Sequence, residues 1–140
     1  MSKLLLLVTF FLSPLSFANA KEETNIADGA LLRGLDKVSG EVVDFGLKSG
    51  DTYSLWKLSI TLSECRYPVS NPVGDAFAHL KIFKEKSESE IFRGWMVASS
   101  PALNPLEDAR YDVWVLRCAM VSTSTESVSY THLRAHETEA

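Results

Sequence analysis

The stretch RGWMVASSPALNPLEDARYDVWVLRC, from Arg93 to Cys118, decides the fold. Apolar runs flank its central loop at residues 91–98 and 113–120, and they are rich in the β-branched and aromatic residues typical of strands. Both runs are apolar at odd and at even positions, so we expect each strand to be covered on both faces and to lie centrally in its sheet. The stretch therefore predicts a strand, a structured loop and a second strand.

The loop between these runs carries two signals for short helical turns. Ser100 precedes Pro101 and Asn104 precedes Pro105, which is the order of a side-chain cap followed by proline at the first helical position. Glu107 follows Asn104 by three residues, as in a capping box. We expect an ordered loop with one or two short helical turns before the last strand.

The clearest alternation of apolar and polar residues lies further towards the N-terminus. The apolar members, which we assign to the core, are Trp56, Leu58, Ile60 and Leu62. This period of two predicts a strand with one buried face. Continued without change, it would place Cys65 on the solvent face. We therefore expect a bulge or a strand end near residues 63–64, which would turn Cys65 towards the core.

Further strands are predicted at residues 31–38, 41–47 and 76–83, separated by turn residues. Trp95 and Trp114 lie in strand patterns like Trp56, and we expect all three to fill the core. These patterns predict an all-β fold, a single-domain antiparallel sandwich or partly open barrel of six or seven strands.

The N-terminus has the pattern of a secretory signal peptide. Lys3 is followed by an apolar run at residues 4–12 and by a small-residue site that ends at Ala20. The run is about half the length that a membrane-spanning helix needs. We expect cleavage after Ala20 and a periplasmic location, with an uncleaved anchor as the alternative. The mature chain would comprise a flexible lead-in (21–29) and the β domain (30–120), without a transmembrane segment.

The chain has two cysteines, Cys65 and Cys118. In an oxidising compartment such a pair favours one structural disulfide. Closing the loop between the two cysteines would stabilise the fold by roughly 4 kcal/mol. Free thiols or an intermolecular bond are the alternatives. A redox site is not indicated, because there is no Cys-x-x-Cys motif, and a zinc site is not indicated, because histidines do not cluster.

The motifs Gly94-Trp95-Met96, 98–106, Tyr111-Asp112-Val113-Trp114 and Cys118 resemble an exported alphaproteobacterial family, catalogued as domain of unknown function 2155. Leu35-Asp36-Lys37 and Cys65 resemble features further upstream in that family. Where family members usually carry a His-Pro pair, this chain has Asp108-Ala109. The resemblance implies an exported domain and implies no activity, substrate or cofactor.

Residues 121–140 differ from the rest of the chain, because Ser and Thr dominate first and apolar content falls. The composition predicts a disordered tail. Residues 128–138 resemble a translated sequencing adapter, so we expect part of the tail to be artefactual. We therefore do not interpret the spacing of His132 and His136 as a metal site.

Composition argues against several functions. The net charge of −4 is spread along the chain without a basic stripe, so we expect no nucleic-acid partner. No phosphate-binding loop, nucleophile elbow or zinc-protease motif is present, and we expect no metal or cofactor. Asp108 and Asp112 flank Arg110 and are expected to form surface ion pairs with it.

The favoured hypothesis is a non-catalytic binding or assembly module of the cell envelope, with another envelope protein as its partner. Its predicted binding surface comprises Ser99, Ser100, Asn104, Glu107, Asp108, Arg110 and Tyr111. A hydrolase is the first alternative and requires His79 to converge with the acidic residues of 105–112. A small-ligand or lipid carrier is the second and requires an apolar cavity between the sheets.

Overall fold

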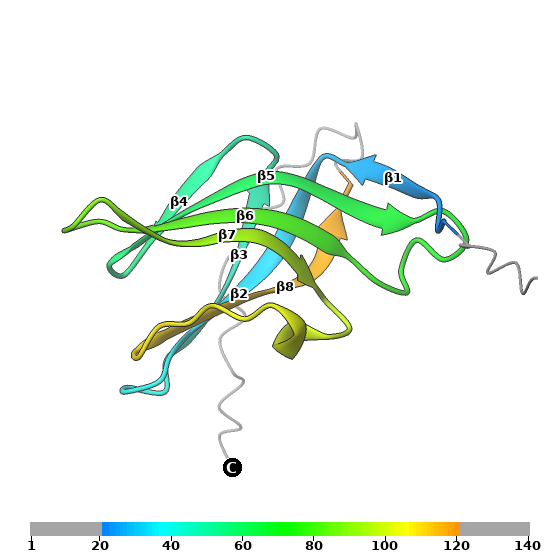
Figure 1. Ribbon diagram of the computed structural model, residues 1–140. Coiled ribbons are helices and arrows are strands. Elements are labelled where there is room, and N and C mark those ends of the chain that lie inside the picture. Colours follow the sequence, from blue (N-terminus) through cyan, green and yellow to red (C-terminus); the bar gives the residue numbers. More distant parts are fainter. Residues whose placement is uncertain (1–20, 121–140) are drawn as a thin grey trace, which may run out of the picture.

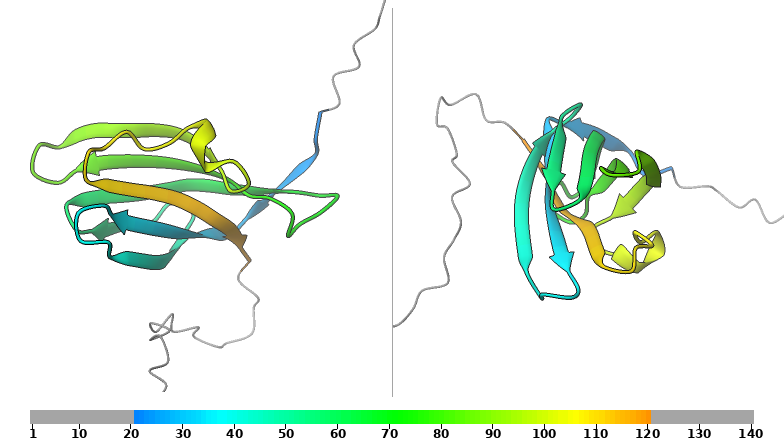
Figure 2. Two further views of the ribbon diagram at one scale, coloured as in Figure 1. Left: turned by 90° about the horizontal axis from the view of Figure 1, so that it is seen from below. Right: turned by 90° about the vertical axis from the view of Figure 1, so that its left-hand side faces the viewer.

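The computed structural model describes residues 21–120, and in this part of the chain eight strands form two antiparallel sheets. The sheets face one another across the core (Figures 1 and 2). The larger sheet has the order β1-β5-β6-β7, with β4 also paired to β5, and the smaller has the order β3-β2-β8. The predicted all-β antiparallel fold is confirmed. The predicted signal peptide (1–20) and tail (121–140) lie outside the described residues.

The larger sheet consists of β1 (Thr24–Ala27), β4 (Thr52–Leu55), β5 (Leu58–Pro68), β6 (Phe77–Lys84) and β7 (Ser89–Val97). The smaller sheet consists of β2 (Gly29–Asp36), β3 (Val42–Lys48) and β8 (Tyr111–Ala119). There is one strand more than the upper expectation of seven. One short strand, β1, lies within residues 21–29, where a lead-in was predicted, and pairs with the C-terminal half of β5.

The core lies between the two sheets and is built from alternate residues of their strands. The largest fully buried side chains are Leu32, Leu58, Ile60, Leu62, Cys65, Leu80, Ile82, Val113 and Val115. Burying one such aliphatic side chain contributes about 1.5–3 kcal/mol. The predicted core assignment of Leu58, Ile60 and Leu62 is therefore confirmed.

The predicted bulge and disulfide are both present. The pairing of β5 with β6 changes register between Leu62 and Glu64, which turns Cys65 inward. Cys65 is fully buried and is bonded to Cys118, with 5.7 Å between the two Cα atoms. The bond therefore joins β5 of the larger sheet to β8 of the smaller one.

The predicted central positions of the two strands at residues 91–98 and 113–120 are wrong. β7 forms one edge of the larger sheet and β8 one edge of the smaller sheet. On the outer face of β7, a neighbouring side chain partly covers the large apolar residue Trp95. This side chain is His79, which packs edge-on against Trp95.

The three tryptophans differ in burial. Trp56 and Trp114 are half-buried and pack against the core. Trp95 is 38% exposed on the outer face of the larger sheet, so its predicted core position is wrong. The reason is parity, because Trp95 shares its side of β7 with Arg93, while Phe92 and Met96 point inward.

Candidate functional site

The loop from Ala98 to Arg110 joins the edge strand of one sheet to the edge strand of the other, and so closes one flank of the sandwich (Figure 1). Leu106 is the loop's buried residue, at 4% exposure, and belongs to the core cluster. Leu103, three residues earlier, is 76% exposed. The loop therefore contributes a core side chain at the flank, where no further strand continues either sheet.

The first end of the loop is held by a carboxylate from another loop. Asp75 accepts hydrogen bonds from the Ser99 hydroxyl at 2.7 Å and from the Ser99 backbone N–H at 3.0 Å. Burial raises the pKa of Asp75, but the hydrogen bonds from Ser99 and Ala76 outweigh it and lower the pKa below its usual range. Ser99, predicted as part of a binding surface, is thus an anchor of the loop.

One of the two predicted helical turns is present. It is the 3-10 turn η1 (Pro101–Leu103), and the Ser100 side chain makes no capping hydrogen bond to it. No turn follows Pro105. The Asn104 side-chain amide instead donates to the Trp95 carbonyl oxygen at 3.0 Å. A Cβ atom at residue 94 would lie 2.9 Å from this amide nitrogen, so the Gly94-Trp95 pair lets the loop approach β7.

Asp108 holds the second end of the loop. Its carboxylate accepts from the backbone N–H groups of Arg110 and Tyr111, both at 2.9 Å, and pairs with Lys84 at 2.8 Å. Burial raises the pKa of Asp108, but Lys84 and the two N–H groups outweigh it and lower the pKa to about 2. Asp108 therefore fixes the path of the chain as it enters β8.

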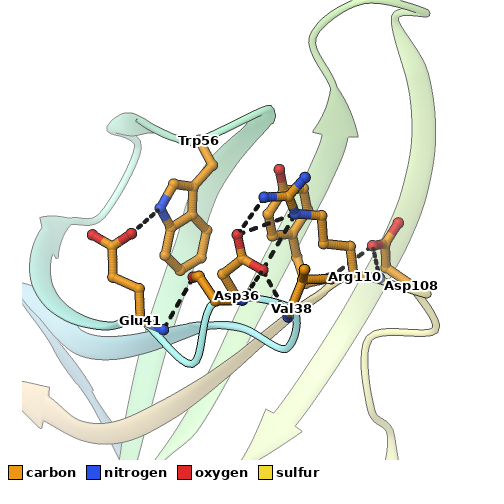
Figure 3. A network of polar contacts seen from close by, with 8 residues as sticks. Asp36, Val38, Glu41, Trp56, Asp108 and Arg110 are labelled. Carbon is orange, nitrogen blue, oxygen red and sulfur yellow. Dashed lines mark hydrogen bonds and ion pairs between the residues drawn. The ribbon is translucent and has the colours of Figure 1, made fainter.

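Arg110 and Asp36 form the most extensive polar contact at this end (Figure 3). The Asp36 side chain is 4% exposed and lies 2.8 Å from Arg110 Nη2. It also accepts from the backbone N–H groups of Val38 and Ser39. The guanidinium of Arg110, together with these N–H groups, lowers the pKa of Asp36 to about 2.

An aromatic stack lies beside this ion pair. The ring of Tyr111 stacks on Trp56 with centroids 5.3 Å apart, and the guanidinium of Arg110 lies 5.3 Å from the Tyr111 centroid. The Trp56 indole N–H donates to Glu41 at 3.3 Å, as Figure 3 shows. Trp56 occupies this place with a positive φ of 54°, uncommon for a bulky residue. The ion pair and the stack together join three loops at one end of the sandwich.

A pocket of about 260 Å³ lies on the surface at this end. Its lining residues are Lys57, Lys84, Lys86, Ser87, Asp108, Ala109, Arg110 and Tyr111. They come from the β4–β5 turn, the β6–β7 hairpin and the entrance to β8. Four of the eight carry positive charge and one carries negative charge.

The residues of the predicted binding surface differ in exposure. Ser100, Asn104, Glu107 and Arg110 are exposed, Asp108 is half-buried, and Tyr111 is only 5% exposed. The expected ion pairing within 108–112 is also wrong. Arg110 pairs with Asp36, Asp108 pairs with Lys84, and the Asp112 side chain caps the Val113 N–H. Asp36 was missed, although a charged residue at a core-facing position of β2 was a usable signal.

A second exposed feature lies on the outer face of the larger sheet at the opposite, disulfide end. One row of residues runs across four neighbouring strands, each residue paired with the next: Ile26, Arg66, Phe77 and Val97. The adjacent row consists of Glu64, His79 and Trp95. The Trp95 ring lies 5.9 Å from the Arg66 guanidinium carbon and 5.2 Å from the His79 ring. We name this surface the Trp95 patch and define it by Ile26, Arg66, Phe77, His79, Trp95 and Val97.

The geometry that a hydrolase would require is not found. His79 lies opposite Glu64 and packs on Trp95. Asp108 pairs with Lys84, which lies on β6 five residues after His79. At the usual rise of a strand these two positions are roughly 16 Å apart. Among residues 21–120 no group of three or more His, Cys, Asp or Glu side chains could hold a metal ion.

The carrier alternative requires an apolar cavity between the sheets, and two pockets lined by described residues can be compared with that requirement. The pocket near Tyr111 opens to solvent at one end of the sandwich. A second, of about 300 Å³, opens at the other end beside Cys118, Asp75 and Ser99. Neither is an enclosed apolar space between the sheets. No helix in the described part of the chain is long and apolar enough to span a membrane.

Comparison with known proteins identifies the family of this chain. A family model described as an uncharacterised protein conserved in bacteria (DUF2155) matches residues 30–118. The match runs from the second residue of β2 to the disulfide cysteine of β8. No curated protein and no solved structure matches the chain.

Proposed function

This chain belongs to the DUF2155 family of uncharacterised bacterial proteins, and we propose that it is an exported, non-catalytic binding domain that docks another protein of the cell envelope through the Trp95 patch. The N-terminal sequence supports export, since residues 1–20 have the pattern of a cleavable signal peptide. The Cys65–Cys118 disulfide also supports it, because such bonds persist in oxidising compartments such as the periplasm.

The exposure of Trp95 is the main observation that supports a binding site at this patch. Trp and Arg are the residues that most often dominate the energy of protein interfaces. Here a 38% exposed tryptophan lies beside Arg66 and His79, and the neighbouring row adds Ile26, which is 61% exposed. An exposed group of large apolar side chains on a sheet face is characteristic of an interaction site.

The patch is also held rigidly, which favours binding. Trp95 lies on a strand and is flanked by His79 on β6 and by Arg66 on β5, whose guanidinium is held by Glu64 at 3.2 Å. The Asn104 amide fixes the backbone of Trp95 from the other side. A preformed surface loses little conformational entropy when a partner binds.

A photo-reactive amino acid introduced in the living cell tests the proposal. Placed at Val97, inside the patch, it should crosslink the protein to one dominant envelope protein. Placed at Gly46, on the outer face of the smaller sheet, it should not. Crosslinks of equal yield and identity from both positions, or none from Val97 while the folded protein is abundant, would count against the proposal.

A further inference from the structure

The pocket near Tyr111 combines two kinds of surface in a way that the Trp95 patch does not. It is lined by three lysines, Lys57, Lys84 and Lys86, and by Arg110. Most of its accessible surface is nevertheless apolar. Ala109, the ring of Tyr111 and the hydrocarbon stems of the lysines can supply that surface.

Only some of these positive charges are neutralised within the protein. Arg110 pairs with Asp36 and Lys84 pairs with Asp108. Lys57 and Lys86 have no ion-pair partner among residues 21–120. Glu85 and Glu88 belong to the same hairpin as Lys86, but neither lines the pocket. The pocket therefore contains two cations whose charge is not used in the fold.

The positions of these two lysines are fixed by different elements. Lys57 belongs to the β4–β5 turn, and its carbonyl oxygen accepts from the Glu85 N–H at 3.1 Å. This bond ties the turn to the hairpin that carries Lys86. The Asp36–Arg110 pair (Figure 3) and the Trp56–Tyr111 stack hold the segment that carries Ala109 and Arg110. The backbone positions that carry the two lysines are thus set by the folded structure.

We propose that this pocket binds the anionic end of an amphiphilic molecule, a phosphate or carboxylate group attached to an apolar chain. Lys57 and Lys86 would hold the anion as point charges. The apolar wall would contact the first carbons of the chain. The volume of about 260 Å³ lies just below the range for drug-sized ligands, so it suits a head group better than a whole lipid.

Titration of the folded, oxidised protein with hexyl phosphate, followed by NMR of the backbone amides, tests this site. The amide signals of Lys57, Lys86 and Ala109 should shift together with one dissociation constant. The double variant Lys57→Gln/Lys86→Gln should bind about tenfold more weakly or worse, since it removes both unpaired charges. The variant Lys21→Gln/Lys48→Gln loses the same charge elsewhere and should bind within about twofold of the unmodified protein.

Two further titrations identify what the pocket recognises. Inorganic phosphate should bind more weakly than hexyl phosphate, because it lacks the apolar chain, and hexyltrimethylammonium should not bind. Hexanoate separates the carboxylate from the phosphate as the preferred head group. Equal affinity of the lysine variant, or equal binding of the cationic amphiphile, would overturn the proposal. The variant Trp95→Ala should retain hexyl phosphate binding. The proposed anion site and the proposed Trp95 patch can therefore be tested independently.

Discussion

Arg110 forms a bidentate ion pair with Asp36, 74 residues earlier in the chain, with Nε 3.2 Å from Oδ1 and Nη2 2.8 Å from Oδ2. The backbone of the two segments is joined as well, because the Lys37 N–H donates to the Arg110 carbonyl oxygen at 2.8 Å. The contact ties the end of β2 to the entrance of β8. It fixes the point at which the loop from Ala98 to Arg110 ends and β8 begins.

Replacement of Asp36 by Asn should lower the melting temperature by several degrees. The substitution leaves a guanidinium without its partner and weakens the hydrogen bonds from Val38 and Ser39. Asp44→Asn is a matched control, because Asp44 also binds an arginine, Arg33, but at 40% side-chain exposure. Exposed pairs contribute about 0–1 kcal/mol, so the control should change little. Equal effects of the two variants in thermal unfolding would contradict the structural role of Asp36.

Stability should fall at acid pH in a defined window. The pKa values of Asp36 and Asp108 are lowered from 3.8 to about 2 in the folded protein. Between these values the unfolded chain binds more protons than the folded one, so stability decreases as pH decreases. The contribution should be complete above about pH 4 and lost as the pH falls through about 2. In urea unfolding at several pH values, the free energy of unfolding of Asp36→Asn should fall less steeply with decreasing pH than that of the unmodified protein.

Leu106→Ala should destabilise the protein by about 2–5 kcal/mol, because it opens a cavity where the loop enters the core. Leu103→Ala, in the same loop, removes the same atoms from a side chain that is 76% exposed, and should change stability by no more than about 0.5 kcal/mol. Urea denaturation of both variants measures the difference. If Leu106→Ala costs as little as Leu103→Ala, the loop does not close the core.

Removal of the disulfide in a Cys65→Ala/Cys118→Ala variant should cost roughly 4 kcal/mol, the loop-closure entropy of 53 residues. The variant should unfold at a lower urea concentration than the oxidised protein. The reduced, unmodified chain provides the control, since it keeps both side chains and loses only the bond. Equal midpoints for the oxidised and reduced proteins would show that the bond adds no stability.

Local patterns predicted those parts of the fold that depend on neighbouring residues. The alternation through Leu58, Ile60 and Leu62 identified β5, and its conflict with a buried Cys65 located the bulge. The same reasoning failed for β7 and β8, because apolar residues on both sides of a strand do not reveal whether another strand continues the sheet. Trp95 could have been placed correctly, since it shares its parity with Arg93.

The candidate sites were less predictable because they depend on contacts between distant segments. Sequence proximity indicated that Arg110 pairs with Asp108 or Asp112, whereas its partner is Asp36. The cations of the pocket near Tyr111 come from three separate segments, and no spacing rule brings Lys57 and Lys86 together. Such sites become visible only when the strand order is known.

The most direct test of the proposed function is the affinity of purified Trp95→Ala for the envelope protein captured from Val97. Tyr53→Ala is the matched control, because Tyr53 is an aromatic residue with the same 38% exposure and lies outside the patch. Loss of about 2 kcal/mol at a hot-spot residue corresponds to roughly thirtyfold weaker binding. We predict a loss of that size for Trp95→Ala and less than about threefold for Tyr53→Ala. Unchanged affinity of a folded Trp95→Ala variant would contradict the proposal.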